Sequence, residues 1–503
     1  MRPFEAILIL VVIAAAAAHI MKVAARWQIS LTLLAGLMGV WHVVRQGTYW
    51  QMFPVLLGLV LLITWQLPSL SLRLSRHVAL KNGLALSVAA LSLASFGLLL
   101  LIPMFSLPKP TGPYPVGTRI IYLKDTSRIE DQGPRPGLPR ELMVQIWYPA
   151  IPSNSHLAAY QRSSETTLAT SYRSVLWTNS KLDAPIATKG SPFPVLLFNH
   201  RWEGVRTQNT FLTEDLASHG YVVAAIDHTY NAGRVAMPDG RIIDDDLGFA
   251  AIDPTKRTAE QILDVWDKEL RKWVADQVFV LNMLQEENLD KQNPWYGKLD
   301  TNKAGAFGHS FGGAASVQVC SVDARIRSGL NMDGWTFGDI RKRASNQPAM
   351  FMYGTKEDEA HLQQDLASKD HGTQEAAELY VNDMKQIDSS LKQYGGYMLY
   401  VNGASHLDFT DHSLVSPWRN WTERGHLSPA RIQTIVRAYV LAFFDETVRG
   451  GNPVLLQSGN SSPFHEVAIE RFIPESKAVN PTGAVQPHGA ISSLEPAARA
   501  DHP

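Results

Sequence analysis

The sequence predicts an α/β fold, a mostly parallel sheet flanked by helices, preceded by an all-α transmembrane region of about four helices. After residue 107, short apolar runs alternate with longer helix-compatible segments, which is typical of a parallel sheet with crossover helices. The first hundred residues instead contain four long apolar stretches. We therefore expect three parts: 1–107, a transmembrane helical region; 108–450, an α/β domain; and 451–503, a C-terminal tail that is partly disordered.

The composition of the chain excludes several classes of protein. The net charge is −1, which provides no electrostatic basis for binding nucleic acid. Cys320 is the single cysteine, so an intrachain disulfide is impossible, and we expect it to be a buried core residue. The metalloprotease motif H-E-x-x-H is absent, and the acidic run 244–246 has the pattern of a solvated loop. We expect no metal and no cofactor.

The four apolar stretches favour a multi-pass membrane anchor. They are Phe4–Met21, Ile29–Val44, Met52–Leu67 and Leu84–Phe105. The first and last approach or exceed the length that spans the hydrocarbon core, and tryptophans flank or end the two shorter ones. A cleaved signal peptide would account for the first stretch only. The region has no intramembrane acid pair of the kind that transport requires, so we expect an anchor.

The basic residues between the stretches predict the orientation of the anchor. With four spans, one side carries Lys22, Arg26, Arg73, Arg76 and Lys81, and the other carries Arg2, Arg45 and Lys109. An excess of Lys and Arg marks the cytoplasmic side of a membrane protein. Both termini and everything after residue 107 are therefore expected outside the cytoplasm, in the periplasm if the chain is bacterial.

Eight strands and five helices are predicted in the α/β domain. The strand candidates are Arg119–Leu123, Leu142–Tyr148, Pro194–Phe198, Tyr221–Ile226, Ala304–Phe307, Gly329–Met332, Ala349–Tyr353 and Tyr397–Val401. The helix candidates are Gln208–Ser218, Thr258–Glu286, Gly313–Val319, Ala376–Gln393 and Pro429–Thr447. Functional groups in such a fold gather at the carboxyl ends of the strands.

The run Gly308–Gly313 contains the pattern G-x-S-x-G with Ser310 at its centre. It follows an apolar strand candidate and leads into a helix candidate. In that context the pattern predicts a nucleophile elbow, a sharp strand-to-helix turn that exposes the serine hydroxyl above the sheet. The glycines permit close packing of the strand and the helix around the strained serine.

A serine nucleophile needs a base and an acid, which in this fold follow it in the order acid, then histidine. His406 lies just after the late strand candidate Tyr397–Val401, so we expect it to be the base, with His412 and His426 as rivals. Asp333 and Asp358 both follow strand candidates. Position in the chain alone does not decide between these two acids.

The oxyanion formed by attack on a carbonyl needs two backbone N–H donors. One is expected from Phe311, the residue after the nucleophile. The other is expected from Trp202, in the loop after the strand candidate Pro194–Phe198. The indole ring of Trp202 is also a candidate wall for the acyl pocket.

Several spaced motifs across about 113–447 resemble those of the plasma-type, secreted platelet-activating-factor acetylhydrolases, a family of the α/β-hydrolase superfamily. They are Pro113–Thr118, Met143–Pro149, Asp215–Ala225, Gly308–Gly313 and His406–Asp411. The resemblance implies an α/β-hydrolase fold and a calcium-independent serine esterase that cleaves short or oxidised acyl chains from phospholipids. It also implies Ser310 as nucleophile, His406 as base and Asp333, rather than Asp358, as acid.

The chain departs from the family in two places. Arg201 stands where the family has glycine, beside the expected oxyanion donor Trp202. The membrane region is the second departure, because the animal enzymes of the family are soluble. It would hold the active site permanently at a bilayer.

The expected function is a membrane-anchored serine ester hydrolase that acts through an acyl-enzyme on lipid or short-chain carboxylic esters. The expected partner is an ester substrate, with phospholipids among the candidates, and no nucleic acid is expected. Two alternatives remain open. One is an acyltransferase that uses the same triad, and the other is a catalytically silent, membrane-anchored binding protein.

Overall fold

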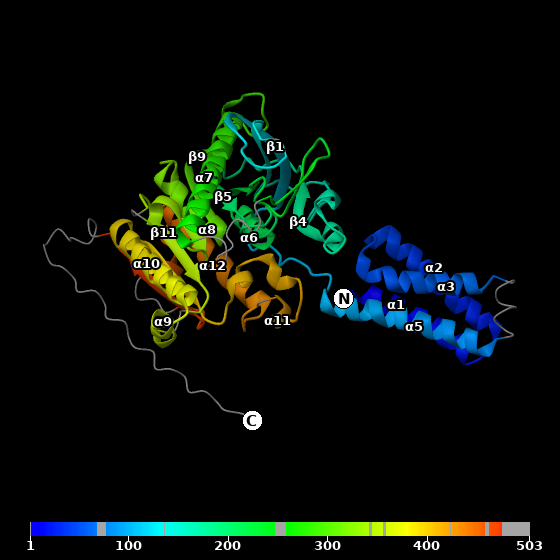
Figure 1. Ribbon diagram of the computed structural model, residues 1–503. Helices are drawn as coiled ribbons and strands as arrows, with labels where there is room; N and C mark the ends of the chain where they lie inside the picture. The colour runs from blue at the N-terminus through cyan, green and yellow to red at the C-terminus, as the bar shows by residue number, and fades with distance from the viewer. Residues whose placement is uncertain are drawn as a thin grey trace.

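The computed structural model describes residues 2–67, 77–134, 136–246, 258–341, 345–355, 359–422, 424–457 and 462–474. Figure 1 shows a bundle of long helices from the first hundred residues projecting from the side of an α/β domain. Of the C-terminal tail expected to be partly disordered, 451–503, residues 475–503 lie outside the described residues.

Within the described residues, the bundle contains four α-helices, α1 (Pro3–Ile20), α2 (Ala25–Gln46), α3 (Phe53–Trp65) and α5 (Val78–Leu101). By length and composition, α1, α2 and α5 could each cross a membrane, whereas α3 and the turn before it form a shorter apolar segment. The sequence predicted about four spans, whereas the structure has three helices long enough to span a membrane and one shorter helix, α3. Large apolar side chains cover the outside of the bundle; Leu10, Leu37 and Leu86 are each more than half exposed.

The α/β domain is built on a sheet that contains eleven strands in the described part of the chain, in the order β13-β12-β11-β10-β9-β5-β6-β2-β1-β4-β3. The central strands β12, β11, β10, β9, β5 and β6 are parallel, whereas β2 is antiparallel to both β6 and β1. The strands are β1 (Val116–Ile129), β2 (Pro139–Pro149), β3 (Leu157–Ala159), β4 (Trp177–Leu182), β5 (Phe193–Asn199), β6 (Val222–Asp227), β9 (Leu299–His309), β10 (Ile326–Met332), β11 (Ala349–Tyr353), β12 (Gly396–Val401) and β13 (Val467–Phe472). A separate hairpin pairs β7 (Arg234–Ala236) with β8 (Ile242–Asp244).

Helices cover both faces of the sheet. The helices described in this domain are α6 (Thr210–Ser218), α7 (Ala259–Leu289), α8 (Phe311–Gln318), α9 (Glu359–Leu366), α10 (His371–Tyr394), α11 (Arg419–Thr422) and α12 (Pro429–Thr447). Strand β5 is buried throughout, and its alternate side chains enter opposite cores. Leu196 and Phe198 pack in the core that includes α6 and α12, whereas Val195 and Leu197 pack in the core that includes α7. This explains the continuous apolar run in the sequence.

All eight predicted strands and all five predicted helices are present; β11 and α12 have the predicted ends, and the others have shifted ends. The sequence analysis missed five strands, the short β3, β4, β7 and β8 and the C-terminal β13. Strand β13 pairs antiparallel with β12 from Val467 to Phe472, beyond the expected end of the α/β domain at residue 450. It has few buried side chains because it lies at the sheet edge, so its apolar periodicity is weak.

Candidate active site

Ser310 lies at the turn between β9 and α8, with a backbone φ of +56°. This left-handed conformation is rare for a residue with a side chain, and it matches the strained serine of a nucleophile elbow. A Cβ added at Gly308 would overlap the Gly312 carbonyl, and one added at Gly312 would overlap the carbonyls of Asn199 and His200. The two glycines of the motif are therefore required by close backbone packing.

His406 begins a short 3-10 turn after β12, and its Nδ1 lies 2.7 Å from Oδ2 of Asp333. Asp333 follows β10, has a φ of +55°, and accepts the Gly354 N–H on its other carboxylate oxygen at 3.1 Å. Because a carboxylate is acceptor-only, Nδ1–H of His406 donates and Nε2 is left as the proton acceptor. The rival acid Asp358 lies outside the described residues.

A cavity of about 970 Å³ brings together all five residues predicted for the site. Ser310, Asp333, His406, Trp202 and Phe311 line it. Six aromatic side chains also line it, from Trp266, Trp335, Phe337, Tyr353, Tyr380 and Tyr400. The rival base His412 also lines this cavity, whereas His426 pairs with the Arg419 side chain at 2.9 Å.

The two predicted oxyanion donors lie on opposite sides of the elbow. Phe311 is the first residue of α8, so its N–H has no acceptor inside the helix. Trp202 lies in the loop after β5, and within the described part of the chain its N–H donates no hydrogen bond. The Trp202 indole packs edge-on against the Phe311 ring at 5.3 Å. Arg201, which stands where the family resemblance expects glycine, donates from Nη1 to the Trp202 carbonyl at 3.0 Å. This hydrogen bond holds the loop that carries Trp202.

A chain of hydrogen bonds that the sequence analysis missed runs behind the elbow. Gln208 accepts the Arg201 N–H at 3.2 Å and donates from Nε2 to Nδ1 of His309, also at 3.2 Å. His309 Nε2–H then donates to the His406 carbonyl at 2.8 Å. Burial, and secondly the neighbouring His406, hold the pKa of His309 well below its usual range, so this ring is neutral. The chain links the loop after β5, the elbow and the base.

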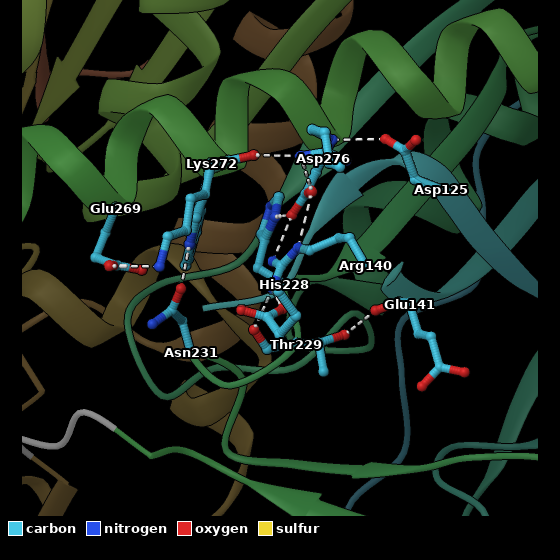
Figure 2. A network of polar contacts seen from close by, with 12 residues as sticks. Asp125, Arg140, Glu141, His228, Thr229, Asn231, Glu269, Lys272 and Asp276 are labelled. Carbon is cyan, nitrogen blue, oxygen red and sulfur yellow. Dashed lines mark hydrogen bonds and ion pairs between the residues drawn. The ribbon is translucent and has the colours of Figure 1, made fainter. Parts of the chain in front are cut away.

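A buried ionic network lies beneath the same strand ends (Figure 2). Asp276 on α7 is fully buried and accepts hydrogen bonds from Arg140 of β2 at 3.1 and 2.8 Å and from His228 Nδ1 at 2.9 Å. Burial alone would raise the pKa of Asp276, but the Arg140 guanidinium outweighs it and holds this pKa below its usual range. The carboxylate is therefore charged.

The network continues to Asn199, the last residue of β5. His228 Nε2 lies 3.0 Å from the Asn199 side-chain oxygen. The Asn199 amide donates to Gln277 of α7 at 2.9 Å and to Ser316 of α8 at 2.8 Å. These two buried hydrogen bonds join α7 and α8 to the end of β5, where the loop that carries Trp202 begins.

Comparison with known proteins identifies the family. A family model described as "Platelet-activating factor acetylhydrolase, isoform II" matches residues 103–450. The platelet-activating factor acetylhydrolase of Cavia porcellus is 26% identical over 337 residues, covering 62% of this chain and 70% of the relative. A probable 1-alkyl-2-acetylglycerophosphocholine esterase of Arthroderma benhamiae is 25% identical over 401 residues, covering 73% of this chain and 94% of the relative.

Among solved structures, a ferulic acid esterase from Streptomyces cinnamoneus superposes with a TM-score of 0.57 and 28% sequence identity. The match covers 73% of this chain and 99% of that esterase. This chain therefore shares its fold with an esterase of known structure. The chain belongs to the platelet-activating factor acetylhydrolase, isoform II family and is a carboxylic ester hydrolase.

Proposed function

We propose that the protein is a membrane-anchored serine esterase in which Ser310, His406 and Asp333 form the catalytic triad. The observation that carries this proposal is the convergence of a strained elbow serine and a hydrogen-bonded His406–Asp333 pair on one cavity of about 970 Å³. The aromatic lining of that cavity suits an acyl chain or an apolar alcohol group.

The reaction follows from the roles of these groups. His406 Nε2 takes the proton of Ser310 as the serine oxygen attacks the ester carbonyl. The N–H groups of Trp202 and Phe311 stabilise the oxyanion, and Asp333 stabilises the imidazolium of His406. His406 then returns the proton to the leaving alcohol, which leaves an acyl group on Ser310. A water molecule, deprotonated by His406, attacks this acyl-enzyme, and His406 returns that proton to the Ser310 oxygen as the carboxylic acid leaves.

We infer from the family that the substrates are lipid or short-chain esters, with phospholipids as the leading class. Two of the relatives are named for hydrolysis of acetylated ether phospholipids. The candidate spans in α1, α2 and α5 would hold the cavity beside a bilayer. With the shorter α3 counted as a fourth crossing, the distribution of basic residues puts the cavity on the extracytoplasmic side.

Turnover of p-nitrophenyl acetate by the purified protein in detergent tests the triad. We expect Ser310→Ala to lower kcat by about 10⁶-fold and Asp333→Asn by about 10⁴-fold, since the latter leaves His406 in the wrong tautomer. Asp358→Asn is the matched control and should stay within about threefold of wild type.

Equal losses in Asp333→Asn and Asp358→Asn would contradict the choice of acid. A folded wild-type protein without turnover, and without labelling by a fluorophosphonate, would instead favour a silent binding protein. Fluorophosphonates report the nucleophile because they form a stable adduct with an activated serine.

A further inference from the structure

A second cavity, of about 280 Å³, adjoins the reaction cavity. Arg201 and His412 line both cavities, so the two share a wall. Phe105, four residues after the end of α5, lies at the second cavity as well. The second cavity therefore lies between the reaction cavity and the end of the last candidate span.

Two of the charged side chains around the second cavity, Arg234 and Glu165, are paired with neighbours of opposite charge. Arg234 pairs with Asp244 at 3.1 Å. Glu165 pairs with Arg206 at 2.6 Å and also with Arg162. These groups hold the wall together and leave little charge for a ligand.

Arg173 differs from them. Its nearest polar partner is the Tyr172 hydroxyl, at a marginal 3.5 Å, and within the described residues it has no carboxylate at ion-pair distance. Burial, and secondly the neighbouring Arg173 and Arg201, lower the pKa of the His412 imidazole to about 4. The Arg173 and Arg201 guanidinium groups therefore both lie near the neutral imidazole of His412, which is part of the wall between the two cavities.

The segment that carries Arg173 contacts the ends of the membrane helices. Arg2, at the start of α1, donates to the Val175 carbonyl at 3.3 Å. Trp50, between α2 and α3, donates its indole N–H to the Ala169 carbonyl at 3.0 Å. If α1, α2 and α5 span a bilayer, this is the level of the lipid headgroups, where phosphate groups are concentrated.

We infer that the second cavity binds the phosphate of a phospholipid whose acyl ester lies at Ser310, with Arg173 and Arg201 as its cationic partners. Guanidinium groups suit phosphate oxygens because they offer several N–H donors in one plane. The Glu203 carboxylate lines the same cavity, which favours the singly charged phosphodiester of a lipid over the more highly charged inorganic phosphate. This inference rests on the proposed function and adds the substrate group that the enzyme recognises.

The test compares two acetyl esters in the same detergent micelles, a 2-acetyl glycerophospholipid and the matching 2-acetyl glycerol ether without phosphate. The measured quantity is the ratio of their kcat/KM values for the full-length wild type and for Arg173→Gln. We expect this ratio to fall about tenfold to hundredfold in Arg173→Gln, the range for losing one charge-assisted hydrogen bond. Arg327→Gln, an exposed arginine away from both cavities, is the matched control.

Added inorganic phosphate, at constant ionic strength, distinguishes the two sources of phosphate. Weak or absent inhibition of phospholipid hydrolysis supports a site for the lipid diester. Strong competitive inhibition that disappears in Arg173→Gln would overturn the lipid assignment in favour of free phosphate.

An unchanged ratio in folded Arg173→Gln would overturn the inference while leaving the triad intact, because the phosphate-free ester reports the triad alone. Persistent turnover of that ester by Ser310→Ala would instead overturn the proposed function, and this inference with it.

Discussion

His309 occupies the variable position before the serine in the elbow motif, which the motif itself leaves undefined. Its two ring nitrogens are both engaged, one by Gln208 and the other by the His406 carbonyl. Because Gln208 donates to Nδ1, the proton of the neutral ring lies on Nε2, where it holds the backbone of the base. We interpret His309 as a positioning residue.

Replacing His309 with Phe tests this interpretation. The ring stays while both hydrogen bonds are lost, so His406 is held less firmly and kcat for p-nitrophenyl acetate should fall about 10- to 100-fold with KM nearly unchanged. His309→Gln, which keeps an amide donor, should recover part of the rate. A rise in KM with unchanged kcat, or no difference between Phe and Gln, would show that His309 only fills space.

At the scale of elements, the ionic network in Figure 2 joins helix α7 to strand β2 and to the loop after β6. Asp276 is its centre, with Arg128 as a further partner at 2.8 Å. A buried charge with its partners in place is tolerated, whereas removal of one member leaves the others unpaired in a low-dielectric interior. The network therefore makes the position of α7 depend on one carboxylate.

We expect Asp276→Asn to lower the free energy of unfolding by about 3–5 kcal/mol, the usual cost of breaking a buried ion pair. Asp388→Asn is the matched control, because Asp388 pairs with Lys392 on the exposed face of α10, and it should cost less than about 0.5 kcal/mol. Urea denaturation in detergent, followed by near-UV circular dichroism, measures both. Similar losses in the two variants would mean that the network contributes no more than a surface pair.

At the scale of the whole molecule, the helical bundle and the α/β domain form one continuous core. Leu107 and Tyr172 pack in the same hydrophobic cluster as residues of α1, α3 and α5. The bundle therefore has a defined place against the domain, on the side that carries the second cavity. This arrangement is what a membrane-held esterase requires if substrate enters from the bilayer.

The orientation of the chain can be measured with a membrane-impermeant maleimide on intact cells. Cys320 is buried, so the wild type should not react. Asn154→Cys, in an exposed loop of the α/β domain, should be labelled if this domain faces outward. Labelling of Asn154→Cys only after the cells are broken would place the domain in the cytoplasm and contradict the assignment from basic residues.

Local patterns in the sequence were enough for the eight predicted strands, the five predicted helices and the elbow at Ser310. Alternating apolar runs and glycine spacing depend on nearby residues only, so they can be read from the sequence without knowledge of the tertiary structure. Strand β13 was missed because it is defined mainly by its pairing with β12, which lies more than sixty residues earlier in the chain. A local pattern cannot report such a distant partner.

The position of residues along the chain left Asp333 and Asp358 open as partners of His406, and only a family resemblance favoured Asp333. The tertiary structure places the Asp333 carboxylate 2.7 Å from His406. It also decides the contacts of His309 and Gln208 and the cavity around Arg173. Each of these unites residues from distant segments, and their distance in space depends on strand order and helix packing, which no local pattern encodes. The sequence by itself determined the elements and the chemistry available at their ends; the fold determined which of those groups meet.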